Sequence, residues 1–166
     1  MSIVQVAFQK SWVTKSLSCF YQVKQLDGYQ DPYLKRPLKM GEIGCFLSHY
    51  FIWEEVIARN LQQVVVFEDD LRFRPNFKSD LGAMMAEVNA LKLEWDLIYL
   101  SRKILKPKLE HWVPRSSKLV VPHYSYWTAA YIISQSGARK LLQQQPLQKM
   151  MAVDEYLPLM FDAHPK

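Results

Sequence analysis

Apolar residues recur along parts of the chain with a helical period, and this period predicts three helices. Over residues 41–60 they return every three or four positions, which is typical of an amphipathic helix with a wide buried face. The apolar residues of this segment are Ile43, Phe46, Leu47, Tyr50, Phe51, Trp53, Val56 and Ile57. The same period predicts a second helix over residues 77–91. A third helix is expected over residues 136–145, with Ser136 as its N-terminal cap.

Other apolar runs lack this period and predict strands. Residues 63–67 contain four consecutive apolar side chains, Val64, Val65, Val66 and Phe67, as in a central strand covered on both faces of a sheet. Residues 95–100 and 124–133 are two further strand candidates. Because strands and helices alternate along the chain, we expect an α/β fold.

The remaining segments carry weaker signals. Short apolar stretches within residues 1–26 are equally compatible with a strand and with a frayed helix. Gly28 and two prolines punctuate residues 28–37, which predicts an irregular loop. Residues 102–118 are basic, contain two prolines and show no period, so we expect an exposed loop there.

Composition narrows the class of protein. A chain of 166 residues with 49% apolar content suits one domain with a single sizeable core. The net charge is +5, but Lys and Arg are scattered, so no nucleic-acid groove is indicated. No apolar run approaches the roughly 20 residues of a membrane helix, and the amino terminus shows no secretion signal. Cys19 and Cys45 are not spaced like a zinc site, and we expect two buried thiols rather than a bridge.

Three consecutive carboxylates, Glu68, Asp69 and Asp70, follow the predicted central strand. Their mutual repulsion and loss of hydration are costly unless a cation compensates. Oxygen ligands of this kind suit a hard divalent ion such as Mn²⁺ or Mg²⁺, and ligands of open α/β sheets sit at the carboxyl ends of strands. The alternative is a solvated acidic turn, which is common after strands.

The start of the first predicted helix is a second candidate region. Gly41 and Glu42 open this helix, and its free N–H groups suit a phosphate or ribose, although capping without a ligand explains them equally well. Ser48 and His49 lie within the same helix. A lone helical histidine is more often structural than catalytic, and a role in a donor pocket is the alternative.

Two groups near strand ends are also placed for ligand contact. Tyr126 and Trp127 lie on a strand whose alternate side chains face opposite ways, so one of them is expected to stack on a sugar or base and the other to pack in the core. Arg102 follows another strand, where it suits ligand contact or is simply a solvated charge.

A colinear series of short motifs spans residues 27–165. In order, the motifs are GYQDPY (28–33), RP (36–37), GEIGCFLSHY (41–50), VFEDDLRF (66–73), WDLIY (95–99), YSYWT (124–128), GARKL (137–141) and VDEYLP (153–158). Their order and spacing resemble glycosyltransferase family 25, whose eukaryotic members include the procollagen galactosyltransferases and an adhesion-associated relative. Such a series is far more specific than any single motif within it.

The resemblance implies a GT-A-like, Rossmann-like mixed sheet with flanking helices. It also implies that Glu68, Asp69 and Asp70 hold Mn²⁺ against the diphosphate of UDP-galactose, with hydroxylysine of collagen as the acceptor. Transfer from an α-linked donor to a β-linked product inverts the anomeric centre and needs a base for the acceptor hydroxyl. Asp154 and Glu155 occupy the matching motif, with Asp154 preferred, and capping or pairing with a lysine is the alternative. The family location implied is the lumen of the endoplasmic reticulum.

The pattern departs from the family at both ends. Residues 1–26 are expected to be a divergent segment, because the family's strand and arginine-rich turn are not recognisable there, and residues 27–166 a partial family domain. The family continues beyond position 166 toward a further histidine motif and a retention tail. Two hypotheses follow: an active, metal-dependent inverting galactosyltransferase domain, or a truncated, inactive member that binds a ligand or a partner.

Overall fold

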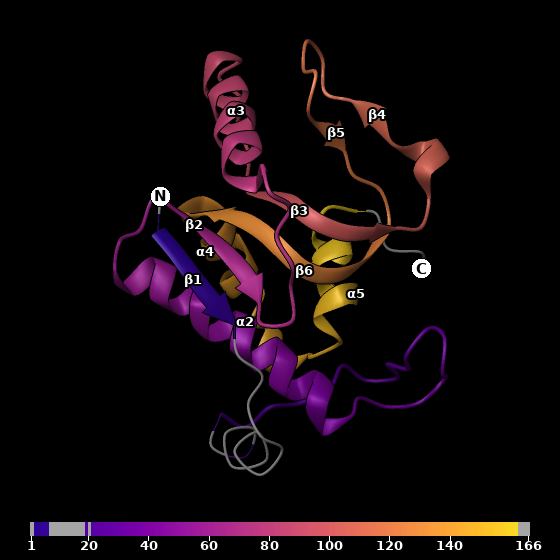
Figure 1. Cartoon of the computed structure of the whole chain (residues 1–166). Helices are drawn as coiled ribbons and strands as arrows, with labels where there is room; N and C mark the ends of the chain where they lie inside the picture. Colours follow the sequence, from indigo (N-terminus) through magenta and orange to yellow (C-terminus); the bar gives the residue numbers. More distant parts are fainter. Residues whose placement is uncertain (1, 7–18, 20, 163–166) are drawn as a thin grey trace.

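The computed structural model describes residues 2–6, 19 and 21–162. Its main sheet has four strands in the order β1-β2-β6-β3 (Figure 1). These strands are β1 (Ser2–Val6), β2 (Gln63–Glu68), β6 (Ser125–Ser134) and β3 (Leu97–Ile104). Strand β1 runs parallel to β2, whereas β6 is antiparallel to both of its neighbours. The sheet is therefore mixed, and the expected α/β class is confirmed.

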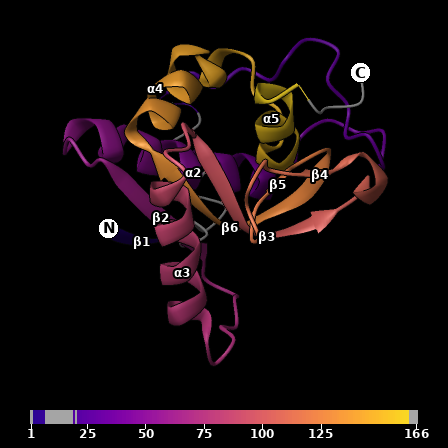
Figure 2. The ribbon, with the colours of Figure 1, turned by 90° about the horizontal axis from the view of Figure 1, so that it is seen from above.

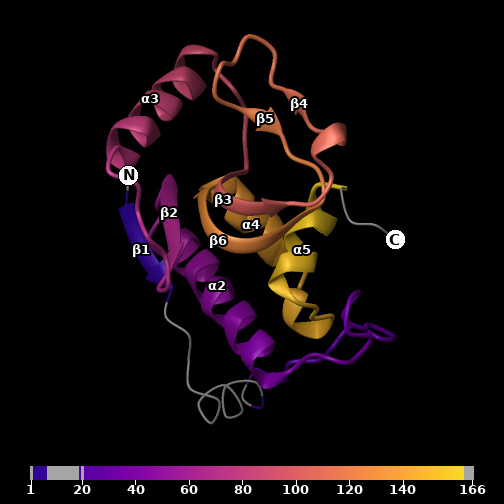
Figure 3. The same ribbon diagram turned by 45° about the vertical axis from the view of Figure 1, so that its right-hand side comes forward.

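Helices flank this sheet on both faces. On one face lie α2 (Met40–Ala58), α4 (Gln135–Gln143) and α5 (Val153–Met160), whose apolar residues form one core cluster with the sheet. The opposite face carries α3 (Phe77–Ala90), so α3 and α4 lie on opposite sides of the strands (Figures 2 and 3). Among the residues described, no helix combines the length and the apolar content that a membrane crossing requires.

Strand β2 is buried on both faces because its apolar residues alternate between two cores. Val64 and Val66 pack in the cluster that includes α2, α4 and α5, whereas Val65 and Phe67 pack on the α3 side. All four are buried. Pairing with β1 and β6 also satisfies the backbone of β2 on both edges. The predicted central strand is confirmed, and its neighbours on both edges and both faces fix its position.

The three predicted helices are present with ends close to those expected, but the cap assigned to the third is wrong. Strand β6 passes directly into α4, and the N-cap is the extended residue Ser134, whose hydroxyl accepts a hydrogen bond from the Gly137 N–H at 3.0 Å. Ser136 instead lies in the first turn, where its hydroxyl donates to the Asp96 carboxylate. The cap lies earlier because strand and helix share a boundary with no loop between them.

The predicted loop at residues 102–118 is more ordered than the sequence indicates. Strand β3 continues to Ile104, a 3₁₀ turn covers Pro107–Leu109, and β4 (His111–Trp112) pairs with β5 (Val120–Val121) in a small second sheet. The guanidinium of Arg102 donates two hydrogen bonds to the Glu110 carboxylate, at 2.5 and 2.8 Å. A bidentate ion pair of this kind has no periodic signature, which is why the sequence pattern does not reveal it. By contrast, residues 28–37 form turns and irregular chain, as predicted.

The amino-terminal segment, for which strand and helix are equally compatible with the sequence, supplies β1 at residues 2–6. Residues 7–18 of that segment lie outside the described part of the chain. The parallel register pairs Ser2 with Val64 and Val6 with Glu68, so β1 runs alongside all of β2 except Gln63. This second neighbour makes β2 an interior strand.

Gly137 at the start of α4 offers a test of how closely this helix packs on the sheet. A Cβ atom at Gly137 would collide with the backbone carbonyl of Asp96, whereas a Cβ at Gly82 in α3 meets open space. We expect Gly137→Ala to lower the free energy of unfolding by about 1–3 kcal/mol, because backbone cannot move aside easily. Gly82→Ala is the matched control and should raise it by up to about 1 kcal/mol. Urea unfolding of both variants checks this, and a neutral Gly137→Ala would contradict the packing.

Candidate functional site

A pocket of about 480 Å³ opens at the carboxyl end of β2. Helix α2, the turn after β2, strands β3 and β6 and the start of α5 all contribute to its wall. The lining residues are Cys45, Glu68, Asp70, Leu71, Ser101, Trp127, Thr128, Ala129 and Asp154. Carboxylates from two separate segments of the chain therefore face one space, which is the arrangement a cation or a proton-transfer reaction requires.

The acidic triplet predicted as the metal site is divided between two pockets. Glu68, the last residue of β2, and Asp70 line the acidic pocket described above. Asp69 lines a larger apolar pocket of about 910 Å³ between β2 and α3, which Glu68 also borders. Successive side chains at a strand end point to different sides, so three consecutive carboxylates do not converge. The structure brings Glu68 and Asp70 together with Asp154 and directs Asp69 elsewhere.

Asp154 lies in the first turn of α5 and shares a hydroxyl group with Glu68. The Thr128 Oγ1 atom is 3.1 Å from Asp154 Oδ1 and 3.2 Å from Glu68 Oε1. A hydroxyl has one proton to donate, so it bonds to only one of the two carboxylates at a time. Burial raises the pKa of Asp154, and the Glu68 charge raises it further, while hydrogen bonds from Thr128 and the Trp127 backbone oppose the shift. Asp154 is therefore a stronger base than an exposed aspartate.

Glu155, the second predicted candidate for the base, has a different environment. Its side chain is fully buried and both carboxylate oxygens accept from the Tyr124 hydroxyl, each at 2.9 Å. It does not line the acidic pocket. The pKa of Tyr126 is raised, mainly by burial and next by its hydrogen bond to Glu155. Glu155 thus ties Tyr124, which directly precedes β6, to α5. Asp154 is the one of the pair that faces the pocket.

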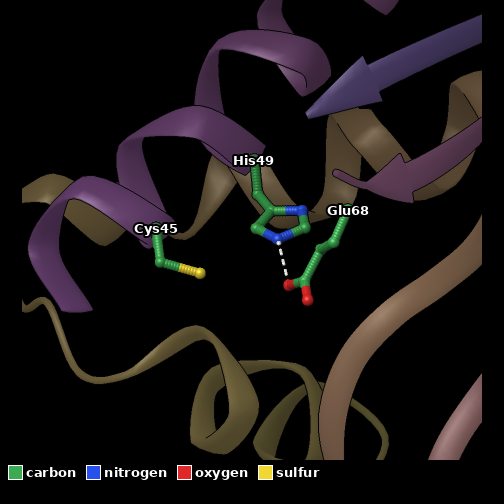
Figure 4. Close-up of side chains that lie close together, drawn as sticks. All are labelled: Cys45, His49 and Glu68. Carbon is green, nitrogen blue, oxygen red and sulfur yellow. Dashed lines mark ion pairs between the residues drawn. The ribbon is translucent and has the colours of Figure 1, made fainter. Parts of the chain in front are cut away.

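His49 is fully buried beside the pocket and has one unsatisfied ring nitrogen. Its Nδ1 atom lies 2.9 Å from the Tyr131 hydroxyl, which also accepts from Trp53 Nε1 at 3.0 Å. Its Nε2 atom lies 3.5 Å from Glu68 Oε1 and has no hydrogen-bond partner among the described residues (Figure 4). The neighbouring Ser48 hydroxyl donates to the Gly44 carbonyl within the helix.

Cys45 lies one helical turn before His49 and was not predicted as a site residue. The Cys45 sulfur, a His49 ring nitrogen and a Glu68 oxygen all lie within 4.8 Å of one another. Burial, followed by the charges of Glu68 and Asp154, raises the pKa of the Cys45 thiol. Cys45 is partly buried but Cys19 is exposed, so the prediction of two buried thiols is wrong for Cys19. The spacing of Cys45 and His49 was the available signal, because residues four apart share a helix face.

The start of α2 lies apart from this pocket. Glu42 accepts a hydrogen bond from the Lys39 N–H at 2.7 Å and two from the Arg36 guanidinium at 2.8 and 2.9 Å. The hydrogen bonds from Arg36 hold the pKa of Glu42 below its usual range. Neither Gly41 nor Glu42 lines the acidic pocket. Glu42 therefore caps the N-terminus of α2, which is the alternative to ligand binding considered for this region.

Of the three remaining predicted site residues, Trp127, Tyr126 and Arg102, only Trp127 lines the acidic pocket. Trp127 lines the pocket with 58% of its surface exposed, and Lys103 Nζ lies 5.3 Å above its ring. Its φ of 65° is left-handed, which costs about 1–2 kcal/mol for a non-glycine residue.

Tyr126 instead packs edge-to-face on Tyr33, with ring centroids 5.2 Å apart. Arg102 is paired with Glu110 and is mostly buried, so it is not a solvated charge. It does not line the acidic pocket, but it lines a separate pocket of about 390 Å³.

Comparison with known proteins places these features in a family. Residues 15–157 match the family model described as glycosyltransferase family 25 (LPS biosynthesis protein). Over 143 residues, which are 86% of this chain, the sequence is 61% identical to the probable inactive glycosyltransferase 25 family member 3 of Bos taurus. Over the same length it is 59% identical to the inactive glycosyltransferase 25 family member 3 of Homo sapiens. It is 54% identical over 144 residues to procollagen galactosyltransferase 1 of Danio rerio. The chain spans about a quarter of the length of these relatives, since each match covers 24% of the relative. The chain belongs to glycosyltransferase family 25.

Proposed function

We propose that the acidic pocket binds the diphosphate of a UDP-sugar together with a divalent cation and supports inverting transfer of the sugar. The observation that carries this proposal is the convergence of Glu68, Asp70 and Asp154 on one space at the end of the central strand. Hard carboxylate oxygens fit Mn²⁺ or Mg²⁺, with Glu68 and Asp70 as the groups that would hold the ion. The bound cation supplies neutralisation of the negative charge on the departing nucleotide.

The residues of this chain have separable roles in such a reaction. Asp154 accepts the proton of the acceptor hydroxyl, and its raised pKa makes it a better base than an exposed aspartate. Thr128 orients the Asp154 carboxylate through its hydroxyl. The exposed ring of Trp127 at the wall of the pocket offers an apolar surface for a sugar ring. Family membership favours UDP-galactose as donor, hydroxylysine of a collagen-like protein as acceptor and the lumen of the endoplasmic reticulum as location.

A second candidate function is a catalytically inactive module that binds a ligand or a partner. The similarity supports it, because the two mammalian relatives named as inactive are 59–61% identical to this chain and procollagen galactosyltransferase 1 of Danio rerio is 54% identical. In this function the same pocket retains nucleotide without turning it over. The two candidates therefore share the binding step and differ in whether transfer follows.

One experiment separates the two functions. The full chain is mixed with UDP-galactose and Mn²⁺, with and without a hydroxylysine peptide, while nucleotide binding is followed by calorimetry and free UDP by a coupled assay. Release that depends on the peptide supports transfer, and binding without release supports the inactive module. An absence of nucleotide binding at millimolar concentrations would rule out both transfer and an inactive module that retains nucleotide.

The division of the acidic triplet predicts unequal effects of two neighbouring substitutions. Asp70→Asn should weaken Mn²⁺-dependent binding of UDP-galactose by at least about tenfold, because it removes an anionic ligand from the pocket. Asp69→Asn is the matched control and should leave the affinity unchanged, since Asp69 lines the other pocket. Calorimetric titration measures both. Equal affinities for the two variants would show that the pocket is not the nucleotide site.

The raised pKa of Asp154 predicts a pH-dependent effect on stability. The folded protein binds the proton of the Asp154 carboxyl group more tightly than the unfolded chain does. Protonation of Asp154 therefore stabilises the fold fully below the usual aspartate pKa, and this stabilisation is lost as the pH rises through the pKa of the folded state. Asp154→Asn removes this dependence. The melting temperature of the variant relative to the original chain should therefore increase as the pH is raised from about 4 toward neutral. Circular dichroism melts across this range measure it, with the exposed Asp69→Asn as control, and a difference that does not change with pH would refute the assigned shift.

A further inference from the structure

We propose that Cys45, His49 and Glu68 form a binding site for a transition-metal ion of the zinc type, distinct in ligand chemistry from the all-oxygen group that includes Asp70 and Asp154. One sulfur, one nitrogen and one oxygen atom from these residues lie within 4.8 Å of one another (Figure 4). Two come from α2 and the third from the end of β2. This inference goes beyond the proposed function and does not depend on it.

The strongest single observation is the unsatisfied nitrogen of His49. The side chain is 0% exposed, and Nε2 has no hydrogen-bond partner among the described residues although it faces the Glu68 carboxylate. Buried polar atoms of this kind are rare, and each calls for an explanation such as an ion. The Nδ1 atom is already bonded to the Tyr131 hydroxyl, which can donate or accept, so Nε2 is free to act as a metal ligand.

The local structure presents these side chains in the manner of known metal sites. Cys45 and His49 are four residues apart on α2, and residues at this spacing project from the same helix face, as the two histidines of a helical zinc motif do. Tyr131 on β6 fixes the ring of His49 from behind. An outer partner on the second ring nitrogen is the usual companion of a ligating histidine.

The distances fit tetrahedral coordination better than a direct contact. The 3.5 Å separation of His49 Nε2 and Glu68 Oε1 is long for a hydrogen bond. Two ligand atoms at zinc bond lengths and a tetrahedral angle are about 3.4 Å apart. The sulfur of Cys45 has to move inward by on the order of 1 Å to reach a Zn–S bond length, a shift within reach of side-chain rotation in a partly buried residue.

The ligand types select the metal and leave one position open. Sulfur and imidazole nitrogen favour Zn²⁺ over Mn²⁺ or Mg²⁺, which take oxygen ligands. Cys45 and Glu68 also line the acidic pocket, which gives the ion an entry path and leaves its fourth position facing that pocket. Binding replaces the S–H bond of Cys45 with a metal–sulfur bond and releases the proton to solvent. An ion held here would link α2 to the end of β2.

Spectroscopy with Co²⁺ tests this site without requiring activity. The full chain is freed of metal with a chelator, kept reduced and titrated with CoCl₂. We expect visible bands of four-coordinate Co²⁺ and a near-ultraviolet charge-transfer band from thiolate to cobalt, and both should disappear when Zn²⁺ is added. Cys45→Ser should abolish the charge-transfer band and weaken binding by more than about tenfold, since loss of an outer-shell partner alone costs that much.

Three further variants make the test decisive. Cys19→Ser removes the exposed thiol and should retain the bands, while Glu68→Gln should weaken Co²⁺ binding. Asp70→Asn should leave the Co²⁺ spectrum unchanged although it weakens nucleotide binding, so failure of one proposal is visible independently of the other. A charge-transfer band that survives Cys45→Ser, or is lost in Cys19→Ser, would overturn the site, as would its absence from the original chain.

Discussion

The burial of strand β2 on both faces is the constraint on which the rest of the structure depends. Val64 to Phe67 alternate between two cores, and β1 and β6 occupy both edges of the strand. A strand held in this way cannot slip by one residue without moving every apolar side chain to the wrong core. Its last residue, Glu68, therefore has one defined position, at the boundary between the core and the acidic pocket. The polar groups of α2, β6 and α5 are arranged around that fixed carboxylate.

Side-chain direction separates the roles of carboxylates that are adjacent in sequence. Asp154 and Glu155 are neighbours on α5, but one faces the pocket and the other is enclosed by tyrosines. Asp69 and Asp70 are likewise neighbours that line different pockets. In both pairs the chemical groups are the same or nearly so, and only the direction of the side chain differs. Membership of family 25 extends over 143 residues, but the chemistry of the pocket depends on these directions.

Two kinds of metal-ligating groups meet at Glu68. Asp70 and Asp154 line the acidic pocket together with Glu68. The sulfur of Cys45 and a ring nitrogen of His49 lie within 4.8 Å of the same carboxylate. In the two proposals, a zinc-type ion and the nucleotide-bound cation would use the same Glu68 carboxylate. Glu68 is thus the residue that the two proposed sites share.

The sequence by itself determined the class of fold, the central strand, the main helices and the family, because period and motif order are local properties of the chain. It also identified Glu68, Asp70 and Asp154 as candidates. Tertiary structure decided which of them share a pocket, that Glu42 and Arg102 are held by ion pairs instead, and that Cys45 joins His49. It also placed the cap of α4 at Ser134. Side-chain direction at strand and helix ends is set by packing between distant segments, and no local pattern records it.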